Sequence, residues 1–169
     1  SGGSPGAALA AGLFEIRRAP GIYRPALAMP VPVPGNPVTL LDVGANAEVR
    51  PEHLVQFAFM GAALASTVLG VRRPRVALLA NGEEPGKGTP TVIEAHAQLH
   101  ARAAGSELLE FLGNVEGTDV TTGVADVIVT DGFTGNVAIK LMEGVSQTIL
   151  AAVREAALST TRAKVGGAL

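Results

Sequence analysis

The chain has 169 residues, a formal net charge of -2, a hydrophobic fraction of 47%, no cysteine and one tyrosine. This length suits one domain with a sizeable core, and the apolar content argues against disorder over most of the chain. The charge provides no basic field for nucleic acid, and the lack of cysteine excludes disulfides and thiolate catalysis. No signal-peptide pattern is visible, and the longest weakly polar run, residues 57–69, is too short to span a bilayer.

Predicted helices and strands alternate along the chain. Ser4 and Pro5 mark the start of a helix over 5–18. The proline-rich segment 21–37 is predicted to be an edge strand or a surface connection, and the apolar run 38–43 is typical of a buried parallel strand. The remaining predicted elements are a helix over 52–69, a strand over 75–80, a helix over 89–104, strands over 108–112 and 124–130, and a helix from Gly135 to about Ser159.

This alternation predicts an α/β fold, a mostly parallel sheet with helices on both faces. In such sheets, ligands bind beyond the carboxyl ends of the strands. Polar, glycine-bearing loops follow the predicted strands, so we expect these loops to converge on one rim. They are residues 42–46, 81–84, 113–114 and 131–132.

The loop over 82–88 resembles a nucleotide P-loop only in part. Three residues, rather than four, separate Gly82 from the Gly86–Lys87 pair, and Gly88 stands where the motif needs Ser or Thr. A glycine-flanked lysine ahead of a helix nevertheless suits an anion, because free backbone N–H groups point outward there. A flexible turn with a solvated lysine is an equally weighted alternative.

Two other motifs fail on chemistry. Residues 2–6 have the G-x-S-x-G spacing of a serine-hydrolase elbow, but Pro5 lacks the N–H that the oxyanion hole uses. A helix N-terminus that holds an anion is the better interpretation. His96 and His100 lie four apart on a predicted helix without an evident third metal ligand, so we expect a solvated helix face and no metal site.

Polar side chains at the predicted strand ends are candidate site residues. Asp42 and Asp131 each end an apolar strand, where a carboxylate either caps the next loop or orients a cation or a backbone N–H. Asn46 and Asn136 follow glycine-bearing loops. Their amides either donate to phosphate or a carbonyl oxygen, or cap helices.

Several runs, in order along nearly the whole chain, together resemble one family. They are LLDVGAN at 40–46, PEHLVQF at 51–57, PRVALL at 74–79, GEE and GKG within 82–88, GNVEG at 113–117 and ADVIVTDGFTGN at 125–136. The chain resembles the bacterial phosphate acyltransferases of phospholipid synthesis, the PlsX family. Their opening loop usually reads Ser-Ala-Gly-Asn-Thr-Gly, whereas Ser4 and Pro5 replace the Asn and Thr here.

The resemblance implies transfer of a fatty acyl group from an acyl carrier protein thioester to inorganic phosphate, giving acyl phosphate for phosphatidic acid synthesis. It also implies a fold similar to those of phosphate acetyltransferase and the isopropylmalate dehydrogenases. A cytoplasmic homodimer with peripheral membrane contact and no cofactor is expected. Family members are longer at both ends, so we expect residues 1–169 to be a single-domain fragment with little activity alone.

Such an enzyme must hold phosphate, place it on the thioester carbonyl and stabilise the developing oxyanion. The expected phosphate-binding residues are Ser1, Gly2, Gly3 and Lys87. The expected catalytic residues are Asn46, Lys87, Asp131 and Asn136, with Asp42 and Glu83 to orient them.

Alternatives remain open. One is a different enzyme on the same fold, either a short-chain phosphate acyltransferase that uses coenzyme A or a dehydrogenase, although no G-x-G-x-x-G follows a strand. The other is a non-catalytic, membrane-binding fragment. The dimer contact is expected on the final helix, residues 136–157, or on the apolar helix 52–69, since both carry more apolar surface than a lone domain buries.

Overall fold

The structure is a computed structural model that describes residues 21–166, with side chains as far as Leu158. The chain divides into two compact units, residues 1–136 and residues 137–169. We call the first the sheet unit and the second the helical unit. The helix predicted over 5–18 lies outside the described residues.

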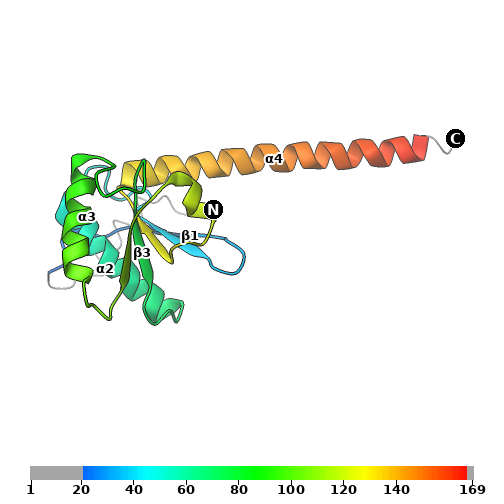
Figure 1. Ribbon diagram of the computed structural model, residues 1–169. Coiled ribbons are helices and arrows are strands. Elements are labelled where there is room, and N and C mark those ends of the chain that lie inside the picture. Colours follow the sequence, from blue (N-terminus) through cyan, green and yellow to red (C-terminus); the bar gives the residue numbers. More distant parts are fainter. Residues whose placement is uncertain (1–20, 167–169) are drawn as a thin grey trace, which may run out of the picture. The chain divides into compact units, whose positions relative to one another are not determined.

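A five-stranded sheet, in the order β1-β2-β5-β3-β4, forms the centre of the sheet unit (Figure 1). Its strands are β1 (Ala28–Val31), β2 (Val38–Leu41), β3 (Arg75–Leu79), β4 (Glu110–Val115) and β5 (Val127–Val129). All neighbouring pairs are parallel except β1 with β2, which is antiparallel. The predicted mostly parallel α/β sheet is confirmed. The proline-rich segment supplies the edge strand, where a missing N–H costs least.

The helices are α2 (Pro51–Val68), α3 (Pro90–Ala103) and α4 (Gly132–Gly166), with a short 3-10 helix η1 (Gly117–Thr121) that was not predicted. A proline opens both α2 and α3, because its missing N–H would have no helical partner there. Thr89 caps α3 by accepting a hydrogen bond from the N–H of Val92 at 3.3 Å. None of the helices within residues 21–166 has the length and apolarity needed to span a membrane.

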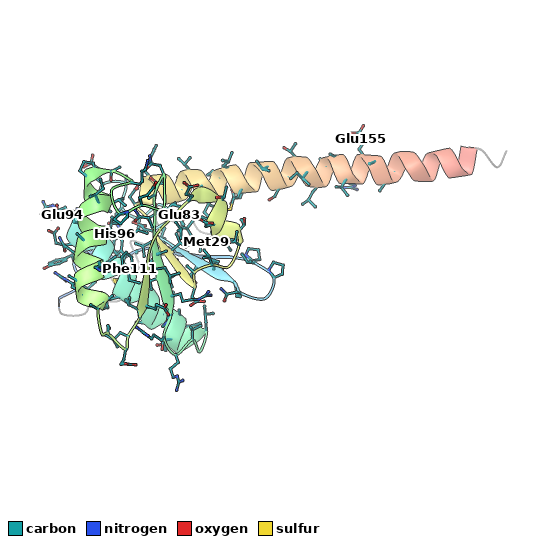
Figure 2. All side chains as sticks on the ribbon, viewed as in Figure 1. Met29, Glu83, Glu94, His96, Phe111 and Glu155 are labelled. Carbon is teal, nitrogen blue, oxygen red and sulfur yellow. The ribbon has the colours of Figure 1, made fainter. Side chains whose placement is uncertain are left out.

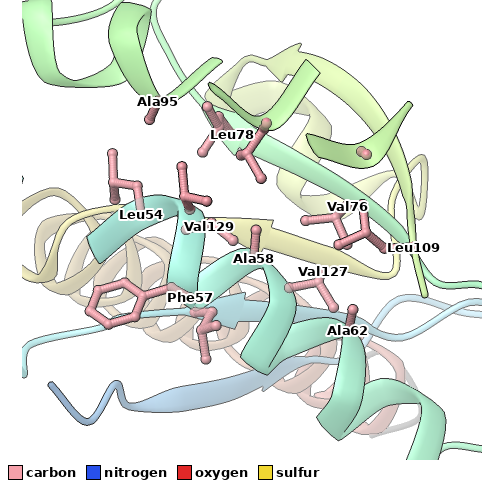
Figure 3. Close-up of a cluster of buried hydrophobic side chains, with 14 of the residues drawn as sticks. Leu54, Phe57, Ala58, Ala62, Val76, Leu78, Ala95, Leu109, Val127 and Val129 are labelled. Carbon is pink, nitrogen blue, oxygen red and sulfur yellow. The ribbon is translucent and has the colours of Figure 1, made fainter. Parts of the chain in front are cut away.

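Helices α2 and α3 share one face of the sheet. Figure 3 shows α2 side chains such as Leu54 and Ala58 facing Val127 and Val129 of β5. Gly61 lets α2 approach closely, since a Cβ there would lie 2.6 Å from Val127 Cγ1. The opposite face is covered too. Its strand residues Leu40, Ala77 and Ile128 are fully buried, which explains why the strands read as continuous apolar runs.

One prediction about the sheet is wrong. Strand β4 continues to Val115, so Gly113 and Asn114 lie within it rather than in a loop after residue 112. The pairing with β3 shifts at this point: Phe111 lies opposite Val76, and Gly113 lies opposite the next residue of β3. Leu112 is therefore the extra residue of a β-bulge. Gly113 has a φ of +96°, which favours glycine. The glycine that reads as the end of a strand therefore bends it instead.

Candidate functional site

The carboxyl ends of β2, β3 and β5 bring their following loops to one edge of the sheet. Because β5 lies between β2 and β3, the start of α4 lies between the loop after β2 and the loop after β3. This edge is where parallel α/β sheets bind their ligands. It lies entirely within the sheet unit.

The loop after β2 is a hydrogen-bond network around Asp42. The backbone of this buried aspartate has a φ of 67°, which Asp tolerates better than most residues. Its carboxylate accepts hydrogen bonds from the N–H groups of Ala45 at 2.8 Å and Asn46 at 3.0 Å, and from the Asn46 amide at 2.9 Å. That amide also donates to the Pro25 carbonyl at 2.8 Å. Both N–H groups of the Asn46 side chain therefore hold the loop, and the catalytic role of Asn46 stays a prediction.

The first turn of α4 packs directly on this loop. The N–H of Gly132 donates to the Asn46 carbonyl at 2.8 Å, and a Cβ on Gly132 would lie 2.7 Å from the Asn46 nitrogen. A Cβ on Gly135 would collide with the Asp42 carbonyl oxygen. The backbone of α4 thus touches the backbone of the loop, so the two segments hold each other in place.

Asp131 and Asn136 lie at the start of α4. The Asp131 carboxylate accepts hydrogen bonds from the N–H of Thr134 at 2.8 Å and from its hydroxyl at 2.7 Å, and so caps the helix. Asn136 is exposed, and its Cγ lies 3.9 Å from where a Cβ on Gly44 would stand. The structure therefore brings Asn136 to the Asp42–Asn46 network.

The loop between β3 and α3 holds Lys87 over Gly82. A Cβ on Gly82 would lie 2.6 Å from Lys87 Cγ, so the absence of a side chain there makes room for the lysine stem. The N–H of Gly88 donates to Asn81 Oδ1 at 2.8 Å. This hydrogen bond joins the two ends of the loop. Lys87 and Glu83 are both exposed in this loop.

Asn114 anchors the same loop from β4. It is 5% exposed, and its amide donates to the carbonyl of Glu84 at 2.9 Å and to that of Lys87 at 3.5 Å. Its Oδ1 is buried and lacks a hydrogen-bond partner in the described part of the chain. The sequence does not reveal this role, because the glycine before Asn114 predicts a loop. A polar residue inside an apolar run was the available signal.

A cavity of about 370 Å³ lies between the loops after β3 and β5. We call it the strand-end cavity. Asp131 lines it, whereas Lys87 and Glu83 belong to the loop beside it without lining it. Ser1, Gly2 and Gly3 lie outside the described residues. The lining residues are Leu79, Ala80, Asn81, Gly88, Thr89, Val92, Asp131 and Thr134.

His96 and His100 stack on each other, with ring centroids 6.4 Å apart. His96 is buried with its ring edge-on to Phe111 at 5.2 Å (Figure 2). Burial, and to a lesser extent the neighbouring His100, lowers the pKa of His96. The predicted solvated face is therefore correct for the exposed His100 and wrong for His96. Within residues 21–166, His, Asp and Glu side chains form no cluster of three that would hold a metal.

The structure resembles that of the EutD phosphotransacetylase from Staphylococcus aureus, with a TM-score of 0.62 and 18% identity over 78% of this chain and 45% of that chain. A branched-chain phosphotransacylase from Enterococcus faecalis gives a TM-score of 0.54 at 21% identity, over 67% of this chain and 46% of that one. At these identities the likeness concerns the fold alone, and it confirms the predicted similarity to phosphate acetyltransferase.

Sequence comparison is more specific. A phosphate acyltransferase from Oceanobacillus iheyensis is 45% identical to the chain, over 100% of the chain and 50% of the relative. The chain thus spans about half the length of the curated relatives it matches. The family model described as fatty acid synthesis protein matches residues 1–169. The chain therefore belongs to the fatty acid synthesis protein family.

Proposed function

We propose that the protein carrying this chain transfers an acyl group from an acyl carrier protein thioester to inorganic phosphate. The observation that supports this most is the match to phosphate acyltransferases over the whole chain, including every loop at the ligand-binding edge of the sheet. In this reaction a phosphate oxygen attacks the thioester carbonyl carbon, a C–O bond forms and the C–S bond breaks. The thiolate leaves and takes up a proton.

In this proposal some site residues bind phosphate, one stabilises the oxyanion, and the others position them. Lys87 offsets the charge of phosphate, together with the hydroxyl of Ser1 and the backbone of Gly2 and Gly3. The Asn136 amide donates to the oxygen that becomes negative when the carbonyl is attacked. The other proposed catalytic and orienting residues act through position: Asn46, Asp42, Glu83 and Asp131.

Placement supports these positioning roles. Asp42 and Asn46 fix the loop on which α4 begins, and Asp131 caps that helix. Asn136 lies about one turn further along α4 and is exposed. A donor held by rigid backbone contacts keeps its orientation during the reaction, which is the condition for strong electrostatic stabilisation.

Replacement of Lys87 tests the proposal. In the protein that carries the chain, Lys87→Ala should raise the KM for phosphate about tenfold or more, because a charge-assisted contact is lost, with a small effect on folding. Lys140→Ala, at an exposed lysine that pairs with Glu143, is the matched control. Acyl phosphate formation is measured with carrier-protein and coenzyme A thioesters as separate donors. An unchanged phosphate dependence in Lys87→Ala would remove Lys87 from the site.

We also propose a cytoplasmic homodimer that contacts the membrane peripherally. The support for a dimer is an exposed apolar stripe on α4, at Val137, Leu141, Val145, Ile149 and Val153. The apolar face of α2, in contrast, is already buried against the sheet. The support for membrane contact is the resemblance to acyltransferases of phospholipid synthesis.

A further inference from the structure

We propose that the strand-end cavity binds the uncharged, amide-bearing pantetheine arm that carries the thioester, and that phosphate binds beside this cavity rather than in it. The inference rests on the proposed function and assigns the place of each substrate. Pantetheine is the chemistry shared by carrier-protein and coenzyme A thioesters, so the subsite fits either source.

Charge is the first argument. The charged side chain that lines the cavity is the carboxylate of Asp131, and no described cation lines it. A phosphate dianion inside the cavity would face this carboxylate at short range and be repelled. A neutral ligand meets no such penalty. Lys87 stands in the neighbouring loop, where it can hold the anion outside.

The lining is the second argument. Leu79, Ala80 and Val92 form an apolar wall suited to the methylene groups of an extended arm. Neutral hydrogen-bonding groups come from the side chains of Asn81 and Thr134. The Asn81 Oδ1 already accepts from Gly88, so its NH₂ is the group that can donate to an amide carbonyl.

The volume of the cavity agrees with this occupant. About 370 Å³ falls in the range of small-molecule sites, roughly 300–1,000 Å³, which combine apolar walls with a few polar groups. Inorganic phosphate is far smaller than such a space and offers no apolar surface to the wall.

Adjacency is the third argument. Gly88 lines the cavity and directly follows Lys87 in the chain. The position of Gly88 is fixed on both sides, by its hydrogen bond to Asn81 and by Val92, whose Cγ1 would lie 2.8 Å from an added Cβ. In this proposal the arm lies with its thioester at the Gly88 side of the cavity, next to the lysine. This arrangement places phosphate and carbonyl within reach of each other.

Filling the cavity at Ala80 tests the inference. Ala80 lines the cavity, and its N–H donates to the Val115 carbonyl at 2.9 Å, a bond that Ala80→Leu retains. Ala97→Leu makes the same change at an exposed position of α3 and is the matched control. Binding of pantetheine and of inorganic phosphate is measured separately by calorimetry, and KM is measured for acyl-pantetheine and for phosphate.

Ala80→Leu should weaken pantetheine binding and raise the acyl-pantetheine KM about tenfold or more, with phosphate values within about twofold of the parent. Holo-carrier protein and coenzyme A thioesters should lose affinity alike. If Ala80→Leu does not fold, Ala80→Val should show a smaller loss in the same direction. Weaker phosphate binding with pantetheine binding retained would overturn the inference, as would unchanged binding of both.

The same experiment separates this inference from the proposed function. If the parent forms acyl phosphate while Ala80→Leu binds pantetheine normally, the subsite is wrong and the function stands. If pantetheine binding depends on Ala80 but no thioester yields acyl phosphate, the function is wrong and the subsite stands.

Discussion

Two glycines at the start of α4 show how single residues shape the site. Gly132 and Gly135 have no room for a Cβ, because the backbone of the loop after β2 occupies that space. Glycine is thus required here for close approach rather than for a left-handed backbone. Asp42 shows the opposite case, a residue other than glycine at a position with a left-handed backbone. A positive φ is adopted by a residue with a side chain, and the carboxylate compensates by accepting N–H groups of its own loop.

Asn114 gives the sharpest residue-scale prediction. Asn114→Asp replaces the amide that donates to the Glu84 and Lys87 carbonyls by a group that repels them. We expect hydrogen exchange to accelerate across residues 82–88, the phosphate KM to rise, and a stability loss of about 1–3 kcal/mol. Exchange measured by mass spectrometry, with phosphate kinetics, checks this.

Two controls separate this role from a general structural one. Glu84→Gln should leave exchange unchanged, since Asn114 contacts the Glu84 backbone and not its carboxylate. In the Lys87→Ala background, Asn114→Asp should have almost no additional effect on phosphate KM, because the two residues act through one contact. Additive effects in the double variant would show that Asn114 does not act through Lys87.

Among the elements, β3 and β5 are joined at their amino ends by Arg75 and Asp126. The carboxylate accepts from the Arg75 backbone N–H at 2.7 Å and from its guanidinium at 2.9 Å. Burial alone would raise the pKa of Asp126, but the hydrogen bonds and charge of Arg75, with a contribution from Asn36, outweigh burial and hold this pKa below its usual value. This pair lies at the end of the sheet opposite the candidate site, so its role is in stability.

Asp126→Asn should destabilise the fold by about 2 kcal/mol at neutral pH, less than for a fully buried pair because Arg75 is partly exposed. A depressed folded pKa contributes stability above the unfolded value of 3.8. That stability is lost as the pH falls through the lower folded pKa. Urea unfolding of parent and variant at several pH values should converge in acid. Glu143→Gln, in the exposed Lys140–Glu143 pair, is the control with little expected change.

At the scale of the whole molecule, the apolar stripe of α4 that begins at Val137 and ends at Val153 is exposed to solvent in a single copy of the chain. Its residues recur every four positions and stay exposed along the helical unit. A ridge with this spacing is the surface by which helices interdigitate. Apolar area of this extent on a helix is typical of an interface.

Val145→Glu should therefore convert a dimer into a monomer at micromolar concentration, because it places a charge inside the apolar contact. Light scattering coupled to size exclusion measures the mass. Gln147→Glu adds the same charge on the opposite side of the helix and should leave the dimer intact. A parent protein that is already monomeric would contradict the prediction.

The sequence by itself determined the features that depend on near neighbours. The alternation of apolar strands with helices predicted the mostly parallel sheet, and a helix over 89–104 was predicted directly after the glycine-rich loop 82–88, where α3 begins. The order of motifs identified the family. These features are recorded in short runs of residues, because propensity, capping and turn chemistry act over a few positions.

Only the tertiary structure decided which of these segments meet. Strand β5 is inserted between β2 and β3, so residues distant in sequence form the ligand-binding edge. The tertiary structure also decided that Asn114 lies in a strand, that His96 is buried, and that the Asn46 amide donates to both Asp42 and the Pro25 carbonyl. A polar side chain has the same appearance in a sequence whether its hydrogen bonds are satisfied or open. Its role depends on neighbours that non-local strand pairing brings to it.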